Sequence, residues 1–351
     1  MKKFLISLLA LLLLASCSGG STSDEEKQVL KVFNWGEYID ESVITEFEKE
    51  FNAKVVYETF DSNEAMYTKL QAGGAYDILV PSDYMIQRLI EEDYLQEIDL
   101  SKVSNMDGLM KETLNKDYDP DMKYSVPLYW GDFGIVYNKE VVDASEVESQ
   151  GWEVLLNTKY KDSLYMYDSE RDSFTPALIA LGYSLNTNSE EELNAAAEWL
   201  KKVNNTMNPV YAGDDVIDQM INESKDIALM YSGDAAYVMT ENEKLDYYVP
   251  VEGSNIWQDA MVVPKNAPNP ELAHEFMNFL LRPDVATKNT EYVGYRTVVQ
   301  EVYDEMVAEG GLFEGNVAYL THSNAKLEEF YYNAETREIM ARLWTTIKVA
   351  H

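Results

Sequence analysis

Hydrophobic and polar positions follow two alternating periods along the first part of the chain. Strand-like runs, short and rich in β-branched and aromatic residues, alternate with amphipathic stretches of helical period. The strand-like runs are VLKVFNW (29–35), KVVYETF (54–60) and YDILVPS (76–82), and the helical ones are ESVITEFEKEFN (41–52) and NEAMYTKLQAGG (63–74). This order predicts a βαβαβ unit with a parallel, doubly wound sheet, whose ligands bind at the carboxyl ends of the strands. Trp35 and Ser82 stand at such ends.

The pattern changes at residues 124–138, where Pro, Gly and aromatic residues interrupt it. A second block follows, with strand-like segments at 163–168 and 226–234 and helices around 174–184 and 189–203. Residues 255–281 then resemble a strand and a helix that belong with the first block. A chain that leaves one domain, builds another and returns predicts a two-lobed clamp, with crossings between the lobes near 131–135 and 255–260.

These patterns divide the chain into four parts. We expect a lipoprotein signal peptide at 1–16 and an acylated cysteine with a flexible tether at 17–28. The first lobe is expected to comprise 29–132 plus 258–303, and the second lobe 133–257 plus 304–351.

The N-terminal segment has the features of an export signal. Lys2 and Lys3 precede a short apolar run that ends in small residues before Cys17. The tetrapeptide Leu14–Cys17 resembles a bacterial lipobox, which predicts lipid attachment to Cys17, a location outside the cytoplasm and contact with the membrane through the anchor. A cysteine that merely falls near a cleavage site is the alternative. Because the chain has one cysteine, the folded body is expected to lack disulfides and thiolate metal sites.

The chain is strongly acidic, with a formal net charge of −34. Loss of the two lysines in residues 1–16 would make the charge more negative still. Such a field repels nucleic acid and enriches small cations near the surface. Acidity that serves only solubility is the bland alternative, so charge alone identifies no ligand.

Motifs of catalysis and metal binding are scarce. His274 and Glu275 lack the second histidine of a zincin helix, and Met122 and Leu128 occupy positions where a calcium loop starting at Asp117 needs glycine and glutamate. The sequence has no G-x-S-x-G nucleophile motif. We therefore predict no enzyme, no catalytic residue, no metal and no cofactor.

Aromatic residues recur beside acidic ones instead. The pairs are Trp35 with Glu37 and Tyr38, Tyr84 with Asp83, Tyr231 with Asp234, and Trp257 with Asp259. A carboxylate gives a cationic amine a charge-assisted hydrogen bond, and ring faces add cation–π attraction. For each pair alone, a packed ring beside a solvated acid is the favoured interpretation. Their repetition across both predicted lobes favours a binding site.

At this point the sequence resembles a known family. The stretches FNWGEYI, YETFDSNEAMYTKL, YDILVPSDYM, VPLYWGDFGIVYN, IALMYSGDA, NIWQDAMVVPKNA, NFLLRPDVA and EYVGY are similar to those of the polyamine receptors of spermidine/putrescine ABC transporters. The resemblance implies a type II periplasmic-binding-protein fold, in which two α/β lobes close over a ligand. It also implies a monomer that delivers a polyamine to the permease subunits of an ABC importer.

The resemblance also implies a set of ligand-binding residues. By motif, these are Trp35, Gly36, Glu37, Tyr38, Ser82, Tyr84, Ser169, Asp172, Tyr231, Asp234, Trp257, Asp259 and Tyr295, with Asp168 adjacent to the set and Phe330 as a candidate for a last contact.

Three departures from the family pattern leave the ligand open. Tyr231 stands where tryptophan is common, Asp234 matches the putrescine-type branch, and the last forty or so residues follow the family poorly. Putrescine and spermidine both stay candidates. From the residues alone, so do a secreted glycosidase, in which two carboxylates flank a sugar, and a clamp for another small cationic solute.

Overall fold

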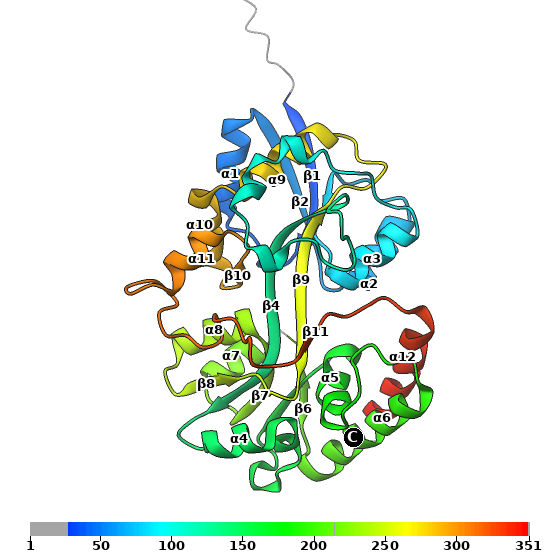
Figure 1. The fold of residues 1–351 in the computed structure, drawn as a ribbon, viewed down its shortest axis with the longest axis vertical. Coiled ribbons are helices and arrows are strands. Elements are labelled where there is room, and N and C mark those ends of the chain that lie inside the picture. The colour runs from blue at the N-terminus through cyan, green and yellow to red at the C-terminus, as the bar shows by residue number, and fades with distance from the viewer. Residues whose placement is uncertain (1–26, 214, 350–351) are drawn as a thin grey trace, which may run out of the picture.

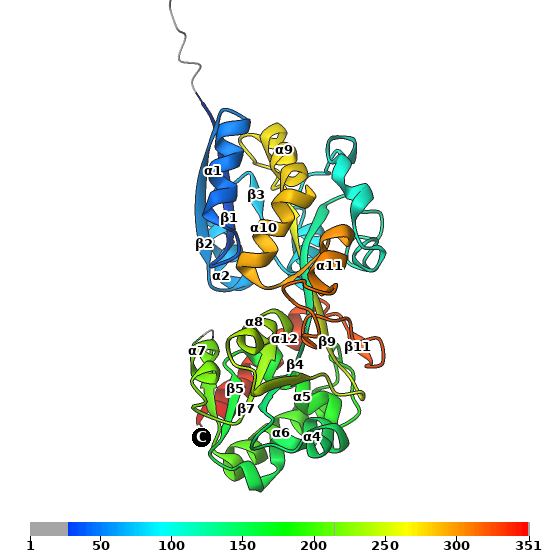
Figure 2. The ribbon, with the colours of Figure 1, turned by 90° about the vertical axis from the view of Figure 1, so that its left-hand side faces the viewer.

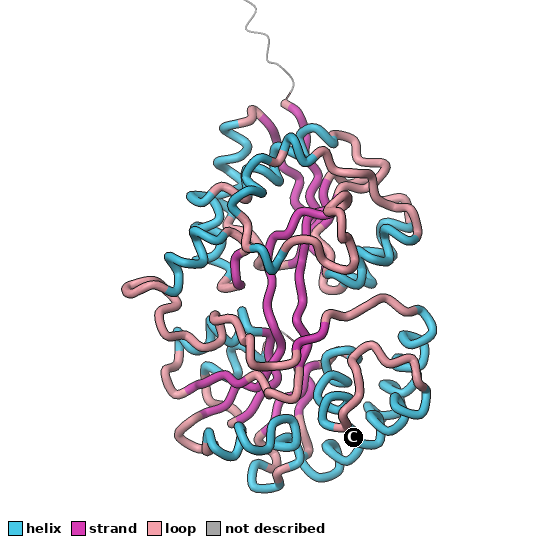
Figure 3. The backbone as a smooth tube through the Cα atoms, in the orientation of Figure 1, coloured by secondary structure: helices cyan, strands magenta, loops and turns pink. Residues whose placement is uncertain are grey.

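The computed structural model describes residues 27–213 and 215–349, which form two α/β lobes joined by a narrow waist (Figures 1 and 2). Strands run through the middle of both lobes and through the waist, and helices lie outside them (Figure 3). We define the first lobe as the upper one in Figure 1 and the second lobe as the lower one.

The first lobe contains the beginning of the chain and a later return. Its elements are β1 (Gln28–Trp35), α1 (Glu41–Glu50), β2 (Ala53–Phe60), α2 (Asn63–Gln71), β3 (Ile78–Leu79), α3 (Asp83–Glu91), the short 3-10 helices Leu100–Lys102, Ser104–Gly108 and Lys111–Thr113, α9 (Pro270–Leu280), α10 (Pro283–Val293), β10 (Arg296–Thr297) and α11 (Gln300–Val307).

The second lobe contains the middle and the end of the chain. Its elements are α4 (Ala144–Gln150), the 3-10 helices Gly151–Leu156 and Thr158–Tyr160, β5 (Leu164–Tyr167), α5 (Glu170–Ala180), α6 (Glu190–Met207), β6 (Val210–Ala212), α7 (Val216–Ile221), β7 (Ile227–Tyr231), α8 (Ser232–Glu241), β8 (Leu245–Tyr248) and α12 (Ala334–Val349).

Two long antiparallel strands, β4 (Ser125–Asn138) and β9 (Ser254–Val262), connect the lobes. The sheet order is β2-β1-β3-β9-β4-β7-β5-β6, with β8 and β10 also paired to β4 and β11 (Leu327–Glu328) paired to β9. Pairing is parallel between β1 and both β2 and β3, and between β5 and both β6 and β7. Each lobe therefore has the parallel arrangement that the sequence predicts, and the strand pair β4 and β9 is antiparallel.

Strand β4 changes partners at its middle. Residues up to Asp132 pair with β9, and residues from Phe133 pair with β7 and β8. This change lies within the region where the sequence predicts a crossing. After α11 the chain also passes from the first lobe to β11 and then to α12, which gives the waist a third connection (Figure 1). The exact lobe boundaries expected from the sequence stay a prediction.

Helix α1 illustrates why the predicted elements form. Asp40 caps it by accepting a hydrogen bond from the Ser42 amide, and Val43 and Phe47, four residues apart, turn one face into the core. The Phe47 ring meets the Phe276 ring of α9 edge to face, with 4.8 Å between ring centroids. Burial of such aromatic pairs holds the helices against the sheet.

Three elements differ from their expected form. The strand expected at 76–82 shrinks to β3, because ladder pairing with β1 and β9 is limited to Ile78 and Leu79. The strand expected at 226–234 ends at Tyr231, where α8 begins. Residues 125–138 form one strand in which every residue is buried, so its sequence shows no alternation.

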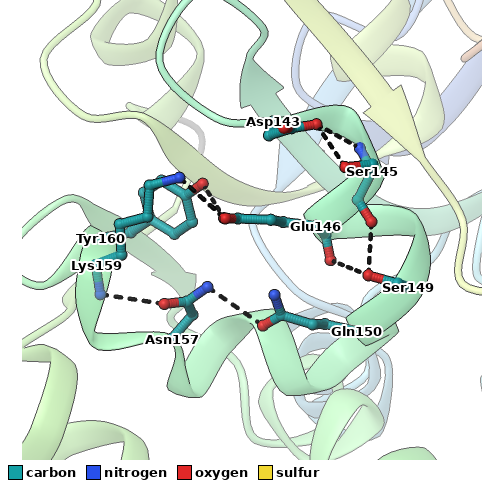
Figure 4. Close-up of polar contacts among 8 residues, drawn as sticks. All are labelled: Asp143, Ser145, Glu146, Ser149, Gln150, Asn157, Lys159 and Tyr160. Atoms are coloured by element: carbon teal, nitrogen blue, oxygen red, sulfur yellow. Dashed lines mark hydrogen bonds and ion pairs between the residues drawn. The ribbon is translucent and has the colours of Figure 1, made fainter.

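At the far end of the second lobe, side chains fasten α4 to the 3-10 helices that follow it (Figure 4). Asp143 caps α4 through the Ser145 amide at 2.9 Å. Glu146 accepts hydrogen bonds from Lys159 at 3.0 Å and from the Tyr160 hydroxyl at 2.5 Å.

No helix within residues 27–213 and 215–349 is both long and apolar enough to cross a membrane.

A fully buried ion pair lies where β4 changes partners. Arg296 of β10 contacts Asp132 at 3.2 Å, and each side chain is 1% exposed. Arg296 also donates to backbone carbonyls of Tyr319 and Leu320, and Asp132 accepts from the Tyr247 hydroxyl at 2.9 Å. These bonds join the first lobe, the second lobe and the third connection at one point.

We predict that Asp132→Asn destabilises the folded protein by about 3–5 kcal/mol, because it leaves the buried Arg296 guanidinium without its counter-charge. Urea unfolding followed by tryptophan fluorescence measures the change. Glu190→Gln, which removes the exposed partner of Arg342, is the control and should change stability little. Equal effects of the two substitutions would contradict the structural importance of the buried pair.

Candidate binding site between the lobes

The segment after β1 supplies the first group of predicted site residues. The half-buried Trp35 ring packs on Phe60, with 4.6 Å between ring centroids, and its buried indole N–H has no hydrogen-bond acceptor among the described residues. Glu37 has a left-handed backbone with φ of 45°, and its exposed carboxylate accepts a hydrogen bond from Tyr292 at 2.7 Å. A Cβ at Gly36 would meet open space. The structure thus places Glu37 on the rim, not among the buried acids.

Tyr38 and Asp259 form the centre of the site. The Tyr38 hydroxyl donates to Oδ2 of Asp259 at 2.5 Å, and both residues are buried. Oδ1 of Asp259 is buried and has no partner among the described residues. Burial raises the pKa of Asp259 to about 6, although hydrogen bonds from Tyr38 and Ser82 lower it. A carboxylate with one unused, desolvated oxygen is suited to receive an ammonium N–H.

Aromatic rings from both lobes surround this carboxylate. Tyr295 follows α10 of the first lobe, Trp257 lies on β9, and Tyr231 ends β7 of the second lobe. Ring centroids are 5.3 Å apart for Trp257 and Tyr295, 5.9 Å for Tyr231 and Trp257, and 5.4 Å for Tyr38 and Tyr295. The rings thus form a continuous wall, as the sequence predicts.

The Tyr295 side chain also reaches across to the second lobe. Its hydroxyl donates to Asp234 of α8 at 2.9 Å, so this predicted acid lies beside the aromatic wall. An added Cβ on Gly233, at the start of α8, would come within 1.4 Å of the Tyr295 ring. Close approach of the two lobes here therefore requires glycine at position 233.

Ser82 and Tyr84 approach the site from the first lobe. Ser82 forms an isolated antiparallel backbone bridge with Asp259. The Asn63 side-chain amide donates to the Ser82 and Tyr84 hydroxyls, at 3.1 Å each, and its oxygen accepts the Ser82 amide at 3.2 Å. Asn63 thereby orients both predicted residues.

The start of α5 supplies the acids of the second lobe. Asp172 is buried, and its pKa is raised by burial, with hydrogen bonds from Ser169 and Tyr231 acting against that rise. Asp168, the adjacent alternative, pairs with Lys348 at 2.7 Å and is half exposed. The structure therefore groups Asp172, Ser169 and Tyr231 and leaves Asp168 in a surface ion pair.

Two residues of this region carried no signal in the sequence analysis. Asn63 resembles any first-turn helix residue, and its role depends on contacts with residues 82 and 84. The Arg171 guanidinium lies over the Tyr84 ring at 3.8 Å and within 5.5 Å of the buried Phe330 ring. This contact joins α5 of the second lobe to α3 of the first, which only the folded chain reveals.

The arrangement combines buried acids from two lobes with aromatic faces. Carboxylates out of contact with water are stabilised by a positively charged partner that also donates hydrogen bonds. Aromatic walls attract such a cation and exclude water from attached methylene groups. No cluster of three or more His, Cys, Asp or Glu within the described ranges could hold a metal ion. The buried acids and the aromatic faces together are suited to an organic cation.

We predict that Asp259→Asn stabilises the free protein at pH 8 but not at pH 4. The folded-state pKa of Asp259, about 6, exceeds the usual 3.8. Folding therefore favours the protonated carboxyl group, and this contribution to the free energy of unfolding is lost as pH rises through 6. The cost of the ionised form above pH 6 is up to about 3 kcal/mol, from 1.36 kcal/mol per pKa unit. Urea unfolding at both pH values tests this, and a loss of stability at pH 8 would contradict it.

Comparisons with known proteins identify the family of the chain. Residues 42–314 match the family model described as bacterial extracellular solute-binding protein. The spermidine/putrescine-binding periplasmic protein of Salmonella typhimurium is 38% identical over 300 residues, which cover 85% of each chain.

Solved structures extend the match to the fold. The spermidine/putrescine ABC transporter substrate-binding protein PotD of Streptococcus pneumoniae has a TM-score of 0.79 and 36% identity, covering 92% of this chain and 99% of that one. The TpPotD lipoprotein of Treponema pallidum has a TM-score of 0.79 and 27% identity, covering 91% of this chain and 99% of that one. The type II periplasmic-binding-protein fold is thereby confirmed. The chain belongs to the bacterial extracellular solute-binding proteins, among the relatives of the spermidine/putrescine-binding periplasmic proteins.

Proposed function

We propose that this chain is the polyamine-binding component of an ABC importer, which captures putrescine or spermidine outside the cytoplasm and delivers it to permease subunits. One observation carries the proposal. A buried aspartate, Asp259, keeps a free oxygen at the centre of an aromatic wall built from both lobes. The relatives of this chain that are named as spermidine/putrescine-binding proteins support the same ligand class.

In this proposal different residues contact different parts of the ligand. Asp259 and Asp172 receive ammonium groups, and Tyr38, Ser82 and Ser169 orient these acids. Trp257, Tyr231 and Tyr295 cover the methylene groups and close over them as the lobes approach. Trp35, Glu37, Tyr84 and Asp234 act at the edges of the same cleft.

The proposal includes a lipid anchor at Cys17 and action as a monomer. Cys17 and the predicted signal peptide lie outside the described residues, so the lipobox-like sequence is the support within this chain. The similar Treponema pallidum protein is named a lipoprotein. The glycosidase alternative has no comparable support, because the matched family and relatives are named as binding proteins.

We expect putrescine, cadaverine or spermidine to raise the melting temperature of the protein, and glucose and glutamate to leave it unchanged. A ligand at 100 times its dissociation constant stabilises the folded state by about 2.7 kcal/mol. Differential scanning fluorimetry with this panel tests the function, with Trp257→Ala as the variant that should lose the response. A shift with the sugar or the amino acid, and none with any amine, would refute the proposal.

We also expect polyamine affinity to fall as pH drops below about 6. The pKa of Asp259 is raised to about 6 by burial, and an ammonium group binds the ionised carboxylate. Where one proton must leave for binding, affinity falls roughly tenfold per pH unit below that pKa. Titration calorimetry at pH 5, 6, 7 and 8 measures the slope. Affinity that is constant across this range would show that Asp259 is not the ammonium acceptor.

A further inference from the structure

Asp83 lies between two predicted ligand residues but has no assigned role. It is the first residue of α3, between Ser82 and Tyr84, and it is 1% exposed. Its Oδ1 accepts the Tyr84 amide at 2.7 Å. Its Oδ2 is buried and has no hydrogen-bond partner among the described residues.

The unpartnered oxygen of Asp83 has a counterpart. Among the described residues, the carboxylates with a buried oxygen that lacks a partner are those of Asp83 and Asp259. The backbone bridge between Ser82 and Asp259 places the two acids next to each other in the fold. Asp83 thus follows the residue that is bridged to Asp259, the Asp259 charge acts on Asp83, and both acids have the unpartnered oxygen that an ammonium group would need.

The charged and titratable groups that influence Asp83 come from several elements. Asp259 of β9 and Glu329 of the segment after β11 add negative charge, and Arg171 of α5 adds positive charge. Burial and the Asp83 charge raise the pKa of Tyr118, but the Tyr118 hydroxyl already donates a hydrogen bond to Gln258 at 2.5 Å. Burial is the main cause that raises the pKa of Asp83, and the Tyr84 amide opposes it.

The nearby cations form no ion pair with Asp83 in the described part of the chain. Arg171 stacks on Tyr84 at 3.8 Å, and Lys116 pairs with Glu329 at 2.7 Å. Ionisation of a buried carboxyl group without an ion-pair partner is unfavourable. A cationic ligand beside Asp83 would supply that partner and favour the ionised form.

Another buried aspartate of the same lobe shows what a structural role looks like. Asp77 is 0% exposed, and its two oxygens accept the Lys31 amide at 2.8 Å and the Asn269 amide at 2.5 Å. These bonds fix the ends of chain segments. Asp83 accepts a single hydrogen bond, from the amide of the adjacent residue in the first turn of α3, so it links no distant segments.

We propose that Asp83 is a further ligand-binding carboxylate, which receives an additional ammonium group beside Asp259 and favours polyamines with three positive charges over those with two. This inference rests on the proposed function. Each ammonium group in the cleft is attracted by the Asp83 charge, so the gain grows with the number of ligand charges. The ligand class is a linear triamine such as spermidine.

The test compares Asp83→Asn with the wild-type protein by titration calorimetry, using spermidine and putrescine at pH 7.5. We expect spermidine affinity to fall by about tenfold or more, since one charge contact between desolvated groups is equivalent to at least that factor, and putrescine affinity to fall less. The melting temperature of the ligand-free variant should equal or exceed that of the wild type. Calorimetry at pH 6.5 in two buffers of different ionisation enthalpy should show fewer protons released by the variant.

Asp77→Asn is the matched control and should lower the melting temperature while leaving the spermidine-to-putrescine affinity ratio unchanged. Asp83→Ser serves as a second variant. Wild-type affinity in Asp83→Asn, or an equal loss for both ligands, would overturn the inference. So would strong destabilisation of both Asp83 variants, which would assign Asp83 to the fold. Failure of the folded wild-type protein to bind any polyamine would instead refute the proposed function.

Discussion

Both lobes depend on one antiparallel pair of strands. Strands β4 and β9 carry the sheet of the first lobe into the second, and β4 exchanges β9 for β7 and β8 between Asp132 and Phe133. At that point the Arg296–Asp132 pair joins the first lobe to the second by charge-assisted hydrogen bonds, because Asp132 also accepts the Tyr247 hydroxyl. Because Trp257 and Asp259 lie on β9 itself, two of the proposed ligand-binding residues belong to the element that joins the lobes. A change in the angle between the lobes would therefore change the positions of Trp257 and Asp259.

The site contains buried polar groups that have no hydrogen-bond partner among the described residues, and such groups lower the stability of the fold. Native proteins pair nearly all of their buried polar groups, yet Asp83 and Asp259 each keep a buried oxygen unpartnered, and the indole N–H groups of Trp35 and Trp257 do the same. Trp257 and Asp259 lie on β9, and Asp83 follows Ser82, which forms a backbone bridge with Asp259. Stability that the fold gives up here becomes available to a ligand that supplies the missing partners, which is the usual relation between function and local strain. The acidic surface, in contrast, acts at long range and attracts cations of any shape.

Much of the fold could be predicted from the sequence because its elements obey local rules. The capped, amphipathic α1 and the apolar runs of β1 and β2 form where expected. Trp257, Tyr231 and Tyr295 were expected together because of the family resemblance, and the structure brings their rings into contact. The nature of β4 could not be predicted, because complete burial removes the alternation that marks a strand. The roles of Asn63 and Arg171 depend on contacts between segments far apart in the sequence. Asp83 was visible as an acid beside a ring, but its missing partner is a property of the folded chain.

The contact between Gly233 and Tyr295 has a geometric consequence. Space at position 233 is so limited that a single methyl group would coincide with the Tyr295 ring, at 1.4 Å from Cδ1. Any side chain there would hold the start of α8 away from the Tyr295 ring and would separate the Tyr295 hydroxyl from Asp234. Gly233 therefore sets how closely the second lobe packs against the first at this contact.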